Sequence, residues 1–219
     1  MQYPIRINKY LRDKDFCSRR EADKIIDEGC VFINNKTAQK GDLVYQEDHV
    51  TVKDYHKENI YLAYYKPRGL PTQDHPEKES VVTQWREQGI YPVGRLDKES
   101  EGLLFLTNDG RFAREVLSDK KEWEKEYLVT VREKINPDLL KVFADGMRSK
   151  TFGKLLPAKT QIIDDNQITI TLREGKRHQI RVMLDEIRYT VVSLKRVRIG
   201  GVALGDMNPG ETREIKWEK

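Results

Sequence analysis

The feature that most constrains this chain is a polar loop that leads into a short apolar strand, within residues 91–110. The loop, residues 94–102, is bounded by glycines and carries Asp97, and the apolar run 103–106 follows it directly. The dipeptide Asp109-Gly110 is strong turn chemistry and ends the strand. Loops held between a glycine and a buried strand often present catalytic groups. A solvated polar turn explains the spacing equally well, so only the residue types can distinguish a catalytic loop from such a turn.

Three segments of this region are Gly94-Arg95-Leu96-Asp97, Ser100-Glu101-Gly102-Leu103-Leu104 and Thr107-Asn108-Asp109-Gly110. Together they resemble the active-site signature of RNA pseudouridine synthases. The resemblance covers almost the whole chain. More narrowly, it is to the RsuA-type family, which acts on ribosomal RNA. The reaction breaks the bond between uracil N1 and ribose C1′, turns the base and rejoins it through C5. The resemblance therefore implies an enzyme that needs no metal or redox cofactor.

Three residues are expected to be catalytic through this resemblance. Asp97 matches the nucleophile or base of the Gly-Arg-Leu-Asp motif. Arg181, in Gly175-Lys176-Arg177-His178-Gln179-Ile180-Arg181, matches the arginine that pairs with the aspartate, and a guanidinium nearby favours the ionised carboxylate. Tyr127 matches the tyrosine that stacks on the uracil. From the residues alone, Arg181 could instead bind phosphate or pair with Asp185, and Tyr127 could be a core aromatic.

Four further residues are expected to bind the substrate. Arg95 matches the residue that helps to extrude the base and fills the gap in the RNA stack, and extrusion costs a few kcal/mol. Ile180 is expected to form an apolar wall against the ring. Lys176 and Arg177 lie in the same motif and are expected to contact the RNA. The histidines do not cluster in sequence, so no metal site is predicted.

The first part of the chain predicts a small module of two helices and short strands. Ser18 and Glu21 have the spacing of a capping box, and Gly29 is a natural helix end. The order of these elements is similar to the S4 RNA-binding domain. Basic residues outside the apolar stripes are expected to meet RNA phosphates. They are Lys9, Arg12, Arg19, Arg20 and Lys24. Interleaved aspartates leave an ordinary charged helix surface as the alternative.

The predicted organisation is an S4-like domain over residues 1–53, a polar linker over 54–59 and a synthase domain over 60–219. Alternating strand patterns with inserted helices predict an α+β fold with a mixed, mainly antiparallel sheet. The clearest helix pattern covers residues 176–187. Relatives often carry a glycine near position 188, where this chain has arginine, so the turn geometry there is an open question.

Composition sets wider limits. The formal net charge of +4, from 40 basic and 36 acidic residues, is too small to indicate nucleic-acid binding without the motifs. Cys17 and Cys30 form no metal-ligand pattern and are expected to be reduced. No apolar run approaches bilayer length and the N-terminus lacks the apolar centre of a signal peptide. A cytoplasmic monomer with no membrane contact is expected.

The preferred function is formation of one pseudouridine in ribosomal RNA by base flipping, on the RNA itself or on a ribosome-assembly intermediate. Residues 125–131 look more like the large-subunit enzymes, whereas residues 198–201 look equally like the small-subunit ones. The large subunit is therefore only slightly favoured. Two alternatives remain: a non-catalytic S4-type assembly factor, and a synthase that acts on transfer RNA. The presence of Asp97, Tyr127 and Arg181 together argues against a pure binding protein.

Overall fold

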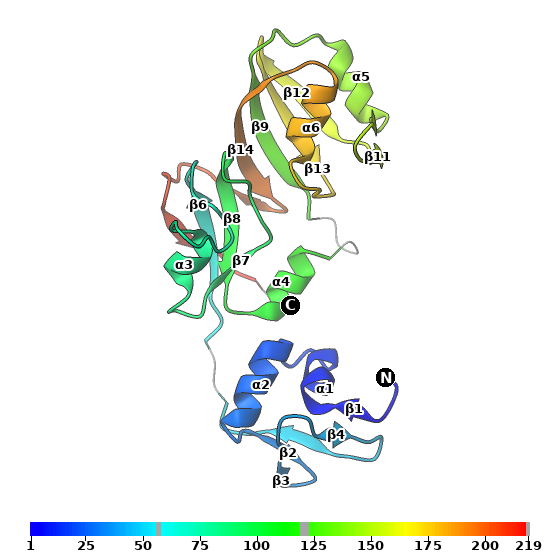
Figure 1. Ribbon diagram of the computed structural model, residues 1–219, viewed down its shortest axis with the longest axis vertical. Helices are drawn as coiled ribbons and strands as arrows, with labels where there is room; N and C mark the ends of the chain where they lie inside the picture. The colour runs from blue at the N-terminus through cyan, green and yellow to red at the C-terminus, as the bar shows by residue number, and fades with distance from the viewer. Residues whose placement is uncertain (56–57, 119–122, 218–219) are drawn as a thin grey trace. The chain divides into compact units, whose positions relative to one another are not determined.

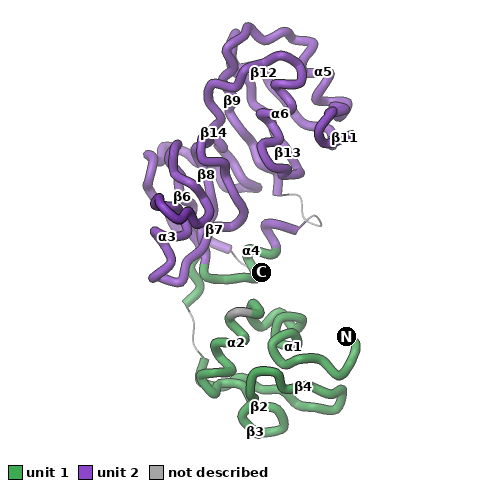
Figure 2. The backbone as a smooth tube through the Cα atoms, in the orientation of Figure 1, with its two compact units in different colours: residues 1–60, 108–114 green, residues 61–107, 115–219 purple. Residues whose placement is uncertain are grey.

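The computed structural model describes residues 1–55, 58–118 and 123–217, with the side chain of Arg20 left out. Residues 56–57, inside the expected linker, lie outside this description. The chain forms two compact units (Figures 1 and 2). The first contains residues 1–60 and 108–114, and the second contains residues 61–107 and 115–219. The predicted α+β class, with a mainly antiparallel sheet, is confirmed.

The first unit has two helices above short strands. The helices are α1 (Ile7–Asp13) and α2 (Arg19–Asp27). The strands are β1 (Ile5–Arg6), β2 (Val31–Ile33), β3 (Lys36–Thr37), β4 (Leu43–Val44) and β5 (Val50–Val52), paired as β3-β2-β5 and β1-β4. Fully buried Ile7, Ala22 and Ile25 join the two helices to the strands in one apolar core. Each helix therefore packs one apolar face against the core, and its opposite face can carry charged residues.

In α2, Ser18 and Gly29 lie at the start and the end of the helix, as the sequence predicts. The Ser18 hydroxyl accepts the backbone N–H of Glu21 at 3.3 Å, which satisfies one of the unpaired donors of the first turn. Glu21 also accepts a hydrogen bond from the Tyr55 hydroxyl at 2.7 Å. Gly29 follows the helix with φ +73°, a conformation that glycine adopts without a steric penalty. The two residues of β1 were not predicted, because so short a strand has no detectable period.

The second unit is built on a nine-stranded sheet with the order β12-β13-β9-β14-β8-β6-β16, in which β15 pairs with β14 and β7 with β8. These strands are β6 (Tyr61–Lys66), β7 (Tyr91–Val93), β8 (Glu101–Thr107), β9 (Lys125–Val131), β12 (Lys159–Asp164), β13 (Gln167–Leu172), β14 (Val191–Ile199), β15 (Val202–Ala203) and β16 (Thr212–Glu214). All named pairings are antiparallel except β14 with β8. That parallel pair joins the two halves of the sheet.

The remaining elements are short, and one of them, the helix at residues 110–116, contains residues of both units. They are α3 (Val81–Trp85), α4 (Gly110–Val116), α5 (Asp138–Ala144), α6 (Gln179–Glu186), β10 (Arg148–Ser149) and β11 (Gly153–Lys154). Helix α5 packs against β12 and α6 against β14 (Figure 1). Buried Phe143, Ile168, Ile170 and Leu184 belong to the apolar core between these helices and the sheet.

The predicted helix 176–187 differs from the structure at its start. Helix α6 begins only at Gln179, and the three preceding residues form a turn that ends at His178 with φ +55°. Arg188, after the helix, also has positive φ (+68°), which answers the question raised by the missing glycine. Within the described ranges, no helix is both long and apolar enough to cross a bilayer.

Candidate active site

A pocket of about 470 Å³ lies in the second unit, where the Asp97 loop meets β9, β14 and the start of α6. Six of the seven predicted catalytic and substrate-binding residues line it: Arg95, Asp97, Tyr127, Lys176, Arg177 and Ile180. Tyr127 and Ile180 are buried, whereas Arg95, Lys176 and Arg177 are exposed. The pocket thus combines buried side chains, apolar ones among them, with a basic rim, as expected for a small-molecule or base-binding site.

The backbone of the Asp97 loop is held by other parts of the fold. Every carbonyl from Arg95 to Glu99 accepts a hydrogen bond. The donors are, in order, Arg196 Nη1 (3.4 Å), the Thr72 hydroxyl (2.6 Å), the Ser100 N–H (3.0 Å), the Gly69 N–H (2.8 Å) together with Lys66 Nζ (3.5 Å), and Arg181 Nη2 (3.0 Å). Loops are ordinarily the mobile parts of a fold, so such a complete set fixes the position of Asp97.

The side chain of Asp97 has one ionic contact among the residues described. His178 Nδ1 lies 3.3 Å from Asp97 Oδ2, an ion pair when the imidazole is protonated. The exposed fractions of the two side chains are 45% for His178 and 26% for Asp97. Both residues line the pocket, so their contact lies at its wall.

Arg181 is hydrogen-bonded to residues 99 and 100 of the Asp97 loop. Its Nη2 donates to the Glu99 carbonyl at 3.0 Å and to the Ser100 hydroxyl at 3.4 Å, while its buried Nε has no partner among the described residues. Burial lowers the pKa of Arg181, and the charge of Asp97 opposes that shift. No ion pair joins Arg181 to Asp97 across the ranges that the structure covers, so direct pairing stays a prediction.

Arg196 is a buried cation that the sequence did not single out. Its side chain is covered, and its Nε donates to the Leu103 carbonyl at 2.6 Å. The guanidinium lies 6.0 Å from the ring centroid of Tyr127, within cation–π range, and both residues line the pocket. Its Nη2 is buried without a hydrogen-bond partner in the described part of the chain. Arg196 therefore links β8, the Asp97 loop and the Tyr127 ring.

Lys66 is the second buried cation, at 0% exposure. Its ammonium donates to the carbonyls of Pro67 (2.8 Å) and Leu70 (2.7 Å) besides that of Lys98. Burial lowers the pKa of Lys66 to about 8, and the negative charge of Asp97 partly offsets this. The lysine holds the turn after β6 against the Asp97 loop.

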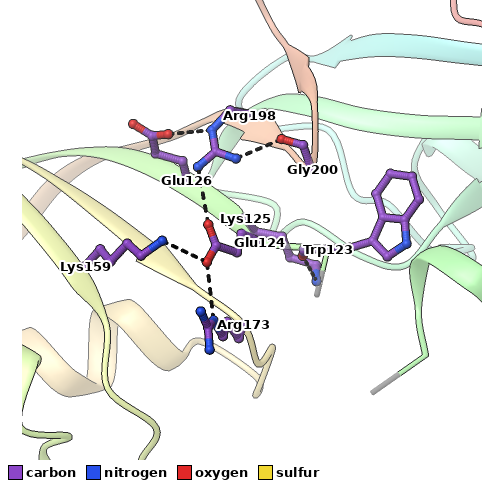
Figure 3. A network of polar contacts seen from close by, with 8 residues as sticks. All are labelled: Trp123, Glu124, Lys125, Glu126, Lys159, Arg173, Arg198 and Gly200. Carbon is purple, nitrogen blue, oxygen red and sulfur yellow. Dashed lines mark hydrogen bonds and ion pairs between the residues drawn. The ribbon is translucent and has the colours of Figure 1, made fainter. Parts of the chain in front are cut away.

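A charged network borders the pocket at the start of β9 (Figure 3). Glu124 Oε1 lies 3.2 Å from Lys159 Nζ and 3.3 Å from Arg173 Nε, and these hydrogen bonds lower the pKa of Glu124. Arg198 donates to Glu126 at 2.7 Å and to the Gly200 carbonyl at 2.8 Å. The network ties together the ends of β9, β12, β13 and β14, and so stabilises one side of the pocket.

Trp123 and Gly200 fit together beside that network. A side chain at Gly200 would place its Cβ 2.7 Å from the indole of Trp123, which is closer than real contacts allow. Trp123 also packs edge-on against Phe105 of β8, with ring centroids 6.3 Å apart. The indole lines the pocket and gives it an aromatic surface besides Tyr127.

The basic residues predicted to contact RNA in the first unit lie on its two helices. Lys9 and Arg12 belong to α1, and Arg19 and Lys24 to α2, whereas the side chain of Arg20 lies outside the description. Several are paired with acids: Arg12 with Asp13, and Lys24 with Glu28 at 3.6 Å. Arg19 and Lys24 are exposed. These side chains are available to phosphates, but acidic neighbours dilute their charge.

Sequence reasoning missed four residues of the site: Lys66, Trp123, His178 and Arg196. His178 could have been found, because it stands in the motif that contains Ile180 and Arg181. Lysine and arginine in strands are expected to face solvent, so nothing in the pattern marks Lys66 or Arg196 as buried. Their burial follows from long-range pairing in the sheet.

Comparison with known proteins identifies the class. The RNA pseudouridylate synthase family matches residues 60–186, and the S4 domain matches residues 5–50. The chain belongs to the RNA pseudouridine synthase family and carries an N-terminal S4 domain. It is therefore an enzyme that forms pseudouridine in RNA, as the motifs predicted.

Individual relatives agree with this assignment. Dual-specificity RNA pseudouridine synthase RluF of Escherichia coli (strain K12) is 36% identical over 220 residues, which cover 96% of this chain and 75% of that protein. Ribosomal large subunit pseudouridine synthase B of Bacillus subtilis (strain 168) is 34% identical over 224 residues, covering 96% of this chain and 91% of its own length. A pseudouridylate synthase crystal structure superposes with a TM-score of 0.73 at 28% identity, over 97% of this chain and 96% of that one.

Proposed function

We propose that this enzyme isomerises a uridine of ribosomal RNA, with the large subunit favoured, and that Asp97 is its nucleophile or base. The observation that carries the proposal is the fixed position of Asp97 in a pocket that combines buried Tyr127 and Ile180 with exposed basic side chains. A carboxylate so placed can meet a base without reorganising its own loop, which is the geometric requirement for efficient catalysis. The relative named as a large-subunit synthase supports the choice of RNA.

The chemistry assigns a role to each part of the pocket. The reaction conserves atoms: the N1–C1′ bond breaks, a C5–C1′ bond forms, C5 loses its proton and N1 gains one. Asp97 initiates this exchange, and Tyr127 and Ile180 enclose the uracil between an aromatic ring and an aliphatic side chain. Arg95, exposed at the rim, is suited to fill the space that the flipped base leaves in the RNA. Lys176 and Arg177 bind adjacent phosphates.

Arg181 supports the carboxylate through charge. It already holds the carbonyl of Glu99 and the hydroxyl of Ser100, two and three residues after Asp97. Its unpartnered Nε gives it a further donor. Apo geometries of catalytic groups are often looser than those of the complex, so direct pairing with Asp97 is proposed for the RNA-bound enzyme.

We propose that the N-terminal and C-terminal parts of the chain have different tasks. We assign RNA binding to residues 1–53 and chemistry to residues 60–219, joined by residues 54–59. Lys9, Arg12, Arg19, Arg20 and Lys24 are proposed to contact phosphates, which position an RNA without reading its sequence. The flipped uridine is then selected by the pocket.

Transfer RNA is the second candidate substrate, because isomerising a uridine requires the same chemistry of the pocket in either RNA. The test maps pseudouridine in ribosomal and transfer RNA from the source cell, with and without this gene, by carbodiimide modification and primer extension. One ribosomal stop should vanish on deletion, return with the wild-type gene and stay absent with Asp97→Asn. A stop that vanishes only in transfer RNA would overturn the ribosomal assignment. A stop restored by Asp97→Asn would overturn the role of Asp97.

A further inference from the structure

Helix α6 is flanked on both sides by a non-glycine residue in the left-handed conformation. His178 precedes it with φ +55° and ψ +23°, and Arg188 follows it with φ +68°. Residues with a Cβ atom adopt this conformation at a steric cost that glycine avoids. The steric cost at each end of this short helix therefore requires its own explanation.

Arg188 has an ordinary structural explanation. Its N–H donates to the Asp185 carbonyl at 2.9 Å, and the N–H of Tyr189 donates to the Leu184 carbonyl at 2.8 Å. These two bonds are those of a Schellman motif, whose left-handed residue satisfies the last carbonyls of a helix. The strain at Arg188 is therefore a consequence of ending the helix.

His178 has no such explanation from the helix it begins. Residues before a helix normally have extended backbone, and their side chains accept an N–H of the first turn. Ser18 and Ser80, which precede α2 and α3, follow this rule with ψ of 162° and 165°. The side chain of His178 makes no capping hydrogen bond. Starting α6 therefore does not require the conformation that His178 adopts.

A buried frame of hydrogen bonds surrounds the turn in which His178 lies. The Gln179 side chain is 4% exposed, accepts the Lys176 N–H at 2.9 Å and donates to Glu174 at 2.9 Å. The Gln179 N–H also donates to the Lys176 carbonyl at 3.2 Å. This frame closes the turn around residues 174–179. It leaves the imidazole of His178 in the pocket, with Nδ1 3.3 Å from Asp97 Oδ2.

The contact between His178 and Asp97 restrains the carboxylate, which the backbone hydrogen bonds of the loop do not. The hydrogen bonds to the five carbonyls described above fix the backbone but leave the carboxylate free to rotate about its side-chain torsions. His178 is the one ion-pair partner of that carboxylate within the residues that the structure describes. Strained backbone that survives only because its surroundings enforce it is concentrated at functional sites.

We propose that His178 is a positioning residue, which orients the Asp97 carboxylate toward the flipped uridine. The proposal rests on the catalytic role given to Asp97. His178 itself does not take part in bond making. Its strain is kept because the left-handed conformation places the imidazole against Asp97.

Three variants separate this role from a structural one. His178→Gly removes both the strain and the imidazole. His178→Asn tolerates the left-handed conformation and carries an amide Nδ2 as many bonds from the backbone as the imidazole Nδ1. Arg188→Gly removes the equivalent strain at the other end of α6, where the residue makes no contact with Asp97. Asp97→Asn is the reference for lost chemistry.

The measurements are the melting temperature and the release of tritium from C5 in total RNA of cells that lack the gene, labelled with [5-³H]uridine. Both glycine variants should melt about 2–4 °C above wild type, since each relieves one strained residue. His178→Gly should lower kcat about 10–100-fold with little change in KM, because misplacement of a reacting group acts on turnover. His178→Asn should recover most of kcat, and Arg188→Gly should keep wild-type kcat.

Wild-type kcat in His178→Gly would overturn the proposal, as would an equal loss of kcat in Arg188→Gly. A lower melting temperature in His178→Gly, with no rescue by His178→Asn, would show a structural role and also overturn it. Full tritium release by Asp97→Asn would instead refute the proposed role of Asp97. The two failures are therefore distinguishable.

Discussion

The Asp97 loop and the helices of the N-terminal unit use charge in opposite ways. Beside the loop, Lys66 and Arg196 are buried and donate to backbone carbonyls of neighbouring segments. On α1 and α2 the charged side chains are on the surface, and several pair with an acid of the same helix or the residue next to it. The first arrangement fixes a geometry, and the second presents a charged surface.

In the proposed function, this difference corresponds to the division between catalysis and RNA binding. A buried cation loses its hydration, and that loss is offset only when several well-placed acceptors replace the water. Such a site is sensitive to single substitutions. Attraction to phosphates, in contrast, is a sum over many exposed charges, each of which contributes little alone. The two units should therefore respond very differently to mutation.

The largest effect is expected from Gly102→Ala in β8. Gly102 has φ +104°, and an added Cβ would lie 2.3 Å from the backbone oxygen of Arg196. The substitution would strain the backbone and force β8 away from β14, at a cost of about 3–5 kcal/mol in the free energy of unfolding. Urea denaturation measures this cost.

Gly153→Ala is the matched control, because Gly153 also has positive φ (+73°) but nothing within 4 Å of the added Cβ. It should cost only about 1 kcal/mol. Equal losses in the two variants would mean that the close approach of β8 and β14 contributes nothing beyond backbone strain.

An intermediate effect is expected from Lys66→Met. Methionine fills a similar volume but leaves the carbonyls of Pro67 and Leu70 without their buried donor. The expected loss is about 2–3 kcal/mol of stability, together with slower turnover because the Asp97 loop loses one of its supports. Thermal unfolding and tritium release measure the two effects. A stable variant with full activity would show that Lys66 is not needed to hold the loop.

The same lysine predicts a pH dependence. Burial lowers the pKa of Lys66 from 10.5 to about 8, so between these values the unfolded chain binds more protons than the folded one. The contribution of this group to stability must then rise with pH from about 8 toward 10.5. The difference in stability between wild type and Lys66→Met should widen over that range. A constant difference would contradict the lowered pKa.

The smallest effects are expected on α1 and α2. Arg19→Ala and Lys24→Ala should each weaken RNA binding only a few-fold and reduce the salt dependence of binding by about one unit of slope, with kcat unchanged. Filter binding over a range of salt concentrations measures this. Lys36→Ala, on β3, is the control and should leave the slope unchanged. A loss of kcat in Arg19→Ala would contradict the assignment of binding and chemistry to separate parts of the chain.

Local patterns predicted a large part of the fold. Asp164-Asp165-Asn166 is turn chemistry and lies at the tip of the β12–β13 hairpin, and Asn136-Pro137 is a typical helix start and directly precedes α5. Strand β7 was missed because Pro92 interrupts a three-residue run, and β16 because an edge strand of three exposed residues has no hydrophobic period. Helix α6 begins late because the Gln179 frame, a tertiary feature, overrides an unbroken helical pattern.

The site was predicted only as far as its motifs extend. Arg95, Asp97, Tyr127 and Ile180 come from three motifs distant in sequence, and the structure brings them to one pocket. Arg196 and Lys66 could not be found by pattern, because their burial depends on the strands that flank β8. The left-handed conformation of His178 likewise depends on side chains that fold around it. Motifs thus named four residues that line the pocket, and packing determined the buried cations that support them.

The most direct test of this account is a comparison of purified wild type and Asp97→Asn on [5-³H]uridine-labelled RNA from cells that lack the gene. The substitution preserves the size of the side chain and leaves the backbone hydrogen bonds of the loop in place. The account predicts RNA affinity within a few-fold of wild type and a loss of tritium release of at least about 1,000-fold, equivalent to about 4 kcal/mol of transition-state stabilisation. Release at the wild-type rate would show that the carboxylate held at the centre of this pocket is not the group that carries the reaction.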